Sequence, residues 1–274
     1  MSIADKASLF AKMAAPDQRL WYFKQGQMTA GTIYDFANPN MNPVATPPTT
    51  AVVCDNTLNT PGLAQCIGQT NPAANALRLI GATLGASLGL DDNSLILYDR
   101  LVHQGGLDAT SIAAQTTNLP TPALTRYTDG VGVWILVTVW TLVGTTATTI
   151  TASYTNQAGT AGRTTVATAF GGTGFREFGR GILLPLQAGD TGVKSVESVT
   201  LAASTTTAGN FGVALIKPLM PVCLHRFDHE SLVNMLTNGG FAPAIVNSAS
   251  LNFLAYSAST GAWAVGGELL FAED

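Results

Sequence analysis

Short runs of apolar residues, separated by glycine, aspartate, asparagine and threonine, dominate the chain between residues 77 and 219. The runs recur roughly every 8–14 residues, and no helical period extends across this region. Strand-like runs at such spacing, with turn residues between them, favour an antiparallel β-sandwich or jelly roll. We therefore expect a mainly β protein with one helix near each end of the chain.

The sequence GVWILVTVWTLVG, residues 132–144, carries the strongest strand signal. Apolar residues occupy both its odd and its even positions, so we expect both faces of this strand to be covered by other parts of the protein. The next segment, TTATTITASYT at 145–155, is rich in β-branched residues and half polar. This composition predicts a hairpin partner for 132–144 with one exposed face.

Helical patterns occur near the two ends of the chain. Residues 225–240 predict a C-terminal helix that stops at a pair of glycines, and residues 251–256 and 262–271 then predict a last β-hairpin. This tail is expected to form either a small subdomain or additional strands of the main sheet. Residues 2–14 predict a short N-terminal helix. The apolar residues expected to share one face of that helix are Ile3, Leu9, Phe10 and Met13.

Residues 26–76 are rich in glycine, proline, asparagine and threonine, and predict an extended arm because proline fixes extended backbone and removes hydrogen-bond donors. The arm and the segment before it carry large apolar side chains without the periodicity of a self-contained domain. A β core would then fold without residues 1–50. We expect the large side chains to contact partner subunits, and the candidates are Trp21, Tyr22, Phe23, Tyr34 and Phe36.

These patterns divide the chain into three segments. Residues 1–76 hold the N-terminal helix and extended arm, 77–220 the jelly-roll-like β-sandwich, and 221–274 the C-terminal helix and hairpin. No apolar stretch reaches the roughly 20 residues of a transmembrane helix, so no membrane partner is expected. The N-terminal MSIADKASLF mixes acids with a base and does not resemble a signal peptide, so we expect synthesis in the cytoplasm.

The composition is unusual for a freely diffusing protein, because 46% of the residues are hydrophobic and only 11% are charged. Either the surface is built from uncharged polar residues, or much of it is hidden against other subunits. Both alternatives fit an assembly protein, and we expect a symmetric homo-oligomer. A net charge of −4, with the lysines and arginines scattered singly, argues against nucleic acid as a partner.

The three cysteines fit neither a disulfide framework nor a zinc spacing. A bridge between Cys54 and Cys66 is one alternative, but free or buried thiols are favoured in a protein made in a reducing cytoplasm. Cys223 stands far from both in the sequence.

Several local patterns resemble enzyme motifs but lack the required context. GASLG at 85–89 places Ser87 as a nucleophile would be placed, yet a turn and a strand follow it where a helix is needed. GDTGVKS at 189–195 has a valine between the second glycine and the lysine, so it does not match a phosphate-binding loop. His225 and His229 share a predicted helix face, but histidines at a helix start are more often surface residues than metal ligands. We expect no catalytic residue, cofactor or metal.

Four segments together resemble one family. They are LTRYTDGVGV (124–133), ASYTNQAGTAGRTT (152–165), LPLQAGDTGVKSVESVTLAAS (184–204) and GNFGVALIKPL (209–219). This combination is similar to a group of tailed-bacteriophage virion structural proteins associated with the capsid surface. The resemblance covers about residues 95–220 and rests on turn and strand residues.

The resemblance implies a non-enzymatic virion protein, most specifically a capsid decoration or cement protein that binds the major capsid protein and stabilises the shell. Such proteins commonly act as homotrimers or homodimers, so the resemblance implies one of these two states. A neck or tail component of the virion is an alternative. In the loop 153–165, Asn156 and Gln157 can satisfy backbone groups at a turn, and Arg163 is expected to reach a neighbouring subunit.

A carbohydrate-binding or host-receptor module is the rival class, because jelly rolls often bind sugars. Trp134 and Trp140 could stack on sugar rings. Both lie on the apolar strand 132–144, however, so packing in a core or an interface is the favoured interpretation.

Overall fold

The structure, a computed structural model, describes residues 6–38, 47–57, 66–70, 76–86, 93–120, 123–224, 231–234, 243–258 and 260–273. The helix α1 spans Lys6–Ala14, and the strands of the first half are β1 (Gln18–Met28), β2 (Thr32–Asp35), β3 (Val52–Val53), β4 (Leu77–Ala86), β5 (Asn93–Asp108), β6 (Gln115–Thr116) and β7 (Trp134–Val139). The remaining strands are β8 (Ala147–Asn156), β9 (Arg163–Thr164), β10 (Thr168–Gly171), β11 (Arg180–Leu184), β12 (Val193–Leu201), β13 (Asn210–Leu224), β14 (Ser231–Asn234), β15 (Ala244–Ile245), β16 (Leu251–Ser257) and β17 (Gly261–Glu273).

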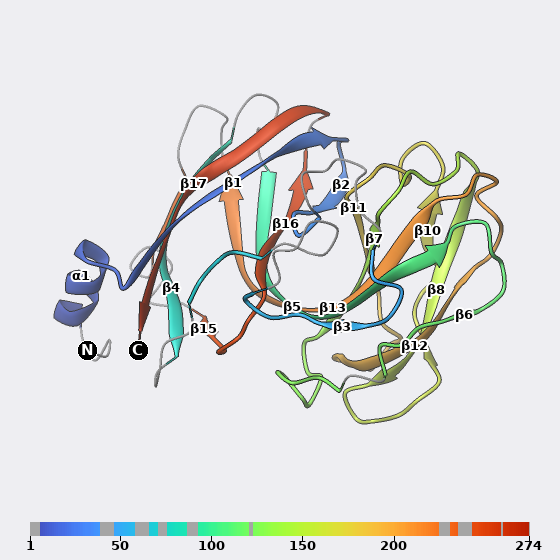
Figure 1. Cartoon of the computed structure of the whole chain (residues 1–274), viewed down its shortest axis with the longest axis horizontal. Helices are drawn as coiled ribbons and strands as arrows, with labels where there is room; N and C mark the ends of the chain where they lie inside the picture. The colour runs from blue at the N-terminus through green and yellow to red at the C-terminus, as the bar shows by residue number, and fades with distance from the viewer. Residues whose placement is uncertain are drawn as a thin grey trace.

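The strands form three antiparallel sheets (Figure 1). Sheet A has the order β1-β17-β4-β14, with β15 paired to β4, and sheet C has the order β10-β8-β12-β6, with β9 paired to β8. Sheet B has the order β13-β7-β11-β2-β16-β5-β3 and closes on itself, because β13 also pairs with β5. The expected mainly β, antiparallel architecture is confirmed.

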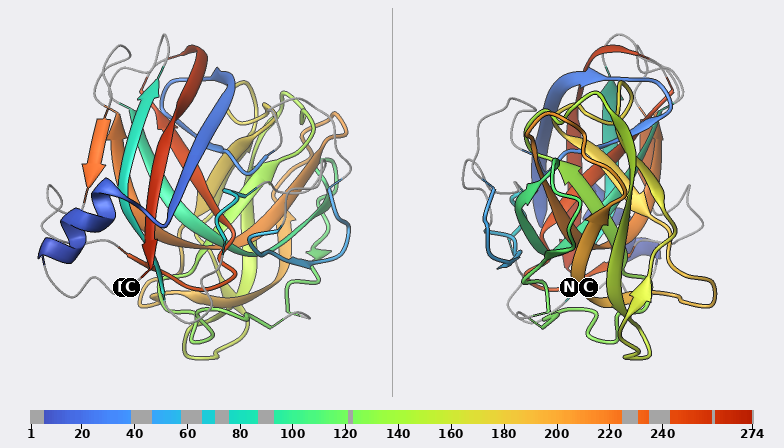
Figure 2. Two further views of the ribbon diagram at one scale, coloured as in Figure 1. Left: turned by 60° about the vertical axis from the view of Figure 1, so that its left-hand side comes forward. Right: turned by 90° about the vertical axis from the view of Figure 1, so that its right-hand side faces the viewer.

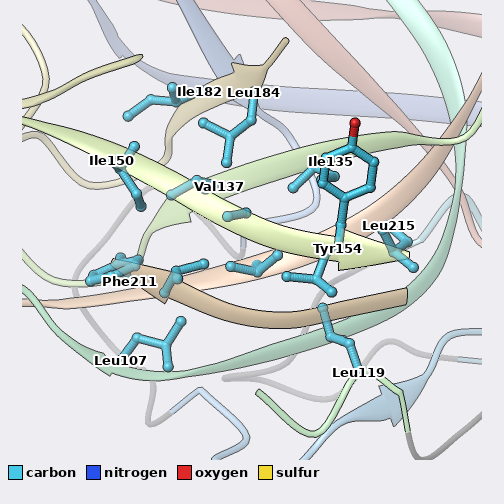
Figure 3. Close-up of a cluster of buried hydrophobic side chains, with 14 of the residues drawn as sticks. Leu107, Leu119, Ile135, Val137, Ile150, Tyr154, Ile182, Leu184, Phe211 and Leu215 are labelled. Carbon is cyan, nitrogen blue, oxygen red and sulfur yellow. The ribbon is translucent and has the colours of Figure 1, made fainter. Parts of the chain in front are cut away.

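Sheet B lies between the other two sheets, and its long strands β5 and β13 run side by side along both halves of the molecule (Figure 1). One apolar cluster fills the space between sheets A and B, and a second fills the space between sheets B and C (Figure 3). A third, smaller cluster contains Tyr98, Leu136 and Ile216, which come from three strands of the closed part of sheet B.

The apolar pattern of β7 follows directly from this arrangement. Ile135, Val137 and Val139 belong to the cluster between sheets B and C, whereas Leu136 belongs to the third cluster. Alternate residues of a strand point to opposite faces. Both faces of β7 are therefore buried, as the sequence predicts.

The predicted hairpin between 132–144 and 145–155 is wrong. β8 lies in sheet C, where it pairs with β10 and β12, while β7 lies in sheet B. The chain crosses between the sheets after Val139, and at Gly144 a Cβ atom would stand 1.7 Å from the Thr205 carbonyl oxygen. The glycine permits this close crossing of two chain segments, which a strand pattern cannot reveal.

The predicted C-terminal elements also need correction. Residues 231–234 form β14, which pairs with β4, so a helix over 225–240 is wrong for these four; residues 225–230 and 235–240 lie outside the described residues. The expected hairpin of 251–256 with 262–271 is wrong as well, because β16 pairs in sheet B and β17 in sheet A. Tertiary pairing overrides the local helical pattern here.

At the N-terminus the helix is confirmed over Lys6–Ala14, whereas residues 2–5 lie outside the described residues. The extended arm predicted over 26–76 is wrong for residues 26–28, which belong to β1, and for residues 32–35, which form β2. β1 pairs with β17 over all eleven of its residues, and β2 is a member of sheet B. Sheet B contains strands from all three predicted segments, so the boundaries at 76 and 220 do not coincide with separate sheets.

A charged group is buried between the two halves of the molecule. The Asp35 carboxylate pairs with Arg100 and accepts hydrogen bonds from the Tyr98 hydroxyl at 2.5 Å and the Thr138 hydroxyl at 2.9 Å. All four residues are buried. Since a buried carboxylate is tolerated only when it is paired and hydrogen-bonded, this cluster fixes how β2, β5 and β7 pack together.

A second buried ion pair lies next to it on β5. Arg126 donates to both carboxylate oxygens of Asp99 at 2.8 Å, and its Nη2 also donates to the Cys54 carbonyl at 2.9 Å. Burial raises the pKa of the Cys54 thiol to about 12. Cys54 and Cys66 are thiols and are not joined in a disulfide, in agreement with the favoured prediction.

Candidate interaction surface

The candidate surface is the outer face of sheet A, and it begins with the alternation of β1. The side chains of Tyr22 and Lys24 point inward and are buried, whereas Trp21 and Phe23 point outward. Trp21 is 81% exposed and Phe23 is 64% exposed. Large aromatic side chains with this exposure on neighbouring outward positions are typical of contact surfaces rather than of monomer surfaces.

The Phe23 ring lies against the backbone of β17, because the residue opposite it in that strand is a glycine. A Cβ atom at Gly266 would lie 3.1 Å from Phe23 Cδ2, so the ring rests against backbone. Trp21 stands opposite Glu268, which pairs with Arg19 at 2.7 Å. The result is an apolar patch bordered by one exposed ion pair.

Helix α1 covers another part of the same face (Figure 2, left). Leu9 packs on Ile80 and Ala272, and Leu270, which stands opposite Arg19 on the outer face, borders this contact. Phe10 was expected on the packed face of the helix, but it is exposed. Residues 9 and 13 share one helix face, and position 10 is rotated away from it.

β1 is also the edge strand of sheet A. In the described part of the chain, β17 is the one strand that pairs with it. An eleven-residue edge with exposed aromatic side chains is a typical site for contact with another chain.

The structure separates the sequence-predicted interface residues into two groups. Tyr22, Tyr34 and Phe36 are buried within the chain, where the Tyr22 ring lies 5.3 Å from the ring of Phe253 and 6.4 Å from that of Phe36. Only Trp21 and Phe23 of this aromatic set are available at the surface. Their contact with a partner subunit stays a prediction.

Arg163 lies far from this patch, on β9 of sheet C. Its Nε donates to Asp190 at 2.9 Å, and the same carboxylate accepts hydrogen bonds from the Tyr154 hydroxyl at 2.5 Å and the Asn156 amide at 2.7 Å. The loop 153–165 therefore binds the loop that follows Leu184 within the same chain. The guanidinium is committed to an intramolecular ion pair.

The enzyme-like and metal-binding motifs of the sequence form no catalytic or metal site within the described residues. Ser87, His225 and His229 lie outside those residues, and GDTGVKS leads directly into β12, which begins at Val193. Within the described ranges, no group of three or more histidine, cysteine or acidic residues could hold a metal ion. The same residues contain no helix with the length and hydropathy needed to cross a bilayer.

The buried cluster around Asp35 extends to a histidine. His103 Nδ1 lies 3.5 Å from Arg100 Nη1, and the His103 ring packs edge-on against Trp140. Burial and the nearby guanidinium lower the pKa of His103 well below its usual value. Asp35, Arg100 and His103 are all buried, and the contacts of Asp35 with Arg100, Tyr98 and Thr138 connect β2, β5 and β7.

Lys24, on the inner face of β1, should make the free energy of unfolding depend on pH. Its ammonium is buried and donates to the Asn38 carbonyl at 3.0 Å, and burial lowers its pKa to about 8. The unfolded state then binds more protons between about pH 8 and 10, so stability should rise with pH by about 2 kcal/mol over this interval.

Replacing Lys24 by methionine should abolish this rise in urea unfolding experiments. The wild-type chain, measured in the same buffers, is the control. Equal pH dependence of both proteins would show that Lys24 is not the group responsible.

Comparison with known proteins adds little to this geometry. No family model matches the chain, and neither does any curated protein. One similar solved structure is the crystal structure of the infectious bursal disease virus VP2 subviral particle, at 11% identity and a TM-score of 0.19, covering 97% of this chain and 86% of that chain. Another is the structure of the infectious bursal disease virus Gx strain, at the same identity and TM-score, covering 93% and 79%. The chain thus has only a weak structural similarity to a viral capsid protein.

Proposed function

We propose that this protein is a non-enzymatic structural component of a virion, and specifically a capsid decoration protein. The observation that carries the proposal is the outer face of sheet A, where Trp21 and Phe23 are exposed on an edge strand. Burial of two such rings supplies apolar area that a stable protein contact needs.

The sequence supports the virion context. The four segments that resemble tailed-bacteriophage structural proteins all lie in the part of the chain that contributes to sheets B and C. The low charged fraction of 11% fits a surface that is covered in an assembly. A net charge of −4 fits a protein partner better than a nucleic acid.

The proposed partners are the major capsid protein and further copies of this chain, as a homotrimer or homodimer on the capsid surface. Sheet A provides the attachment face, and the ion pair of Arg19 with Glu268 borders it. Charged groups at the rim of an interface add specificity, while the aromatic residues contribute most of the affinity.

The test is co-sedimentation of the purified protein with shells of the major capsid protein. The double variant Trp21→Ser, Phe23→Ser should fold normally, because both side chains are exposed. It should bind shells about tenfold more weakly or not at all. Unchanged binding by the double variant would move the attachment site away from sheet A.

A matched control is Ile112→Ser. Ile112 is 62% exposed, close to the value for Phe23, but it lies in the loop before β6 and outside sheet A. Its replacement removes a similar exposed apolar side chain and should leave shell binding unchanged. Equal losses in both variants would indicate general surface hydrophobicity rather than a specific face.

A further inference from the structure

A hollow of about 460 Å³ lies between the start of β7 and the loop that follows β11. This volume falls within the range of small-molecule sites. Its walls are Trp134 on one side and the continuous segment 183–191 on the other. The site is separate from the patch of Trp21 and Phe23, which belongs to sheet A.

Trp134 is the exception in an otherwise buried strand. It is 38% exposed, whereas the five residues after it in β7 are buried, as is Trp140. Of the two expected alternatives, core or interface packing, Trp140 packs in a core, whereas Trp134, at the first position of β7, is not enclosed within the chain. Packing of Trp134 in an interface stays a prediction. A large aromatic side chain lining an open hollow is available to a ligand.

The opposite wall is held rigidly by the loop 153–165. The Gln187 backbone donates to the Tyr154 hydroxyl at 2.9 Å, and the Thr191 backbone donates to the Gln157 side chain at 3.1 Å. The Tyr154 ring lies in the apolar cluster of Figure 3 while its hydroxyl holds this loop. A wall fixed before binding costs little ordering entropy when a ligand arrives.

The charge of this wall is already compensated. Asp190 lines the hollow, and hydrogen bonds from Arg163 and Tyr154 lower the pKa of its carboxyl to about 2. Its partner Arg163 is not one of the lining residues, and among the described residues that line the hollow there is no lysine or arginine. A charged ligand such as a phosphate therefore finds no counter-ion, and a neutral ligand is favoured.

Two polar side chains that line the hollow, Gln187 and Thr191, can form hydrogen bonds with the hydroxyl groups of a ligand. The Gln187 amide and the Thr191 hydroxyl line the hollow, are exposed, and have no side-chain hydrogen-bond partner among the described residues. The Gln187 side chain both donates and accepts. The loop backbone turns back on itself, with the Asp190 amide donating to the Gln187 carbonyl at 3.1 Å, so it presents no strand edge to a peptide.

We propose that the hollow beside Trp134 binds a neutral saccharide ring. One face of such a ring is apolar and fits against the indole, while its hydroxyl groups meet the Gln187 amide and the Thr191 hydroxyl. The proposal does not depend on capsid decoration. A surface glycan is a suitable ligand for any virion protein that carries the site.

The test uses saturation-transfer NMR with the methyl glycosides of glucose, galactose, mannose and N-acetylglucosamine. At least one should show transfer from the wild-type protein. Trp134→Ala and Gln187→Ala should each weaken the apparent affinity by about tenfold or more. Gln187 is exposed, so its variant tests the site even if Trp134→Ala does not fold.

The matched control is Tyr256→Ala, which removes another aromatic side chain, 46% exposed, that does not line the hollow. This variant should bind the glycoside as the wild type does. Absence of transfer for all four glycosides, or undiminished binding by both hollow variants, would overturn the proposal. If the hollow variants lose shell binding instead of glycoside binding, the hollow is a protein contact.

Discussion

Deletion of residues 1–50 should leave a chain that does not fold. Loss of β1 exposes the whole pairing edge of β17, and loss of β2 opens sheet B between β11 and β16. The deletion also removes several residues from the cluster between sheets A and B, namely Tyr22, Met28, Tyr34 and Phe36.

The stability expected to be lost in this deletion is comparable to the whole net stability of a domain. Each fully buried side chain of this size contributes about 1.5–3 kcal/mol, so the four together contribute on the order of 6–12 kcal/mol. A typical domain has a net stability of about 5–15 kcal/mol. The sequence alone predicts the opposite outcome, a folded β core, because the large apolar side chains of residues 1–50 are expected there to contact partner subunits.

Circular dichroism and thermal unfolding of the truncated chain measure this directly. A deletion of residues 1–16 is the control, because it removes α1 and keeps all of β1. The control should keep a cooperative transition at a lowered melting temperature, since Leu9 no longer covers Ile80. A cooperative transition of the larger deletion near that of the control would restore the model of a dispensable arm.

Local patterns predicted the parts of the fold that depend on local chemistry. The two-sided apolar character of β7 follows from its sequence, and so does the turn around Gly159 and Gly162, both of which have positive φ. The same loop was read correctly as a structural element. The ion pair of its Arg163 was missed, because Asp190 lies 27 residues further on and no local signal connects the two. Contact of Arg163 with a neighbouring subunit stays a prediction.

Sheet membership could not be predicted because the partners are distant in sequence. Trp21 of β1 stands opposite Glu268 of β17, at nearly the other end of the chain. The alternation of Trp21 and Phe23 with Tyr22 and Lys24 does carry a signal for one buried and one exposed face. The alternation in RLWYFK does not show which face is buried, because large aromatic residues stand on both faces and the buried face carries Lys24.

The candidate sites, too, combine residues that the local sequence points to with residues that only the tertiary structure brings together. Trp21 and Phe23 were predicted as contact residues from their size, while Trp134 was assigned to a buried strand because its position at the strand end is not visible in the pattern. The polar rim of the hollow comes from Gln187 and Thr191, in a segment that reads only as a turn. Both surfaces depend on where a sheet ends, which is a tertiary property.

Replacement of Arg100 by methionine should destabilise the protein by about 3–5 kcal/mol, because the buried Asp35 carboxylate would lose its partner. Tyr98, Thr138 and the Ala37 backbone amide would still donate to it, but three neutral hydrogen bonds do not compensate a buried charge. Asp35→Leu should cost a similar amount, since it leaves the Arg100 guanidinium unpaired. Urea unfolding at neutral pH gives both values.

The double variant Asp35→Leu, Arg100→Met removes both charges, and it should be more stable than either single variant. Arg19→Met is the matched control, because Arg19 forms an ion pair with Glu268 on the exposed face of sheet A. Exposed pairs of this kind contribute about 0–1 kcal/mol, so the same substitution there should change stability little. If instead the two single effects simply add in the double variant, Asp35 and Arg100 act independently, and the buried pair is not what joins β2 to β5.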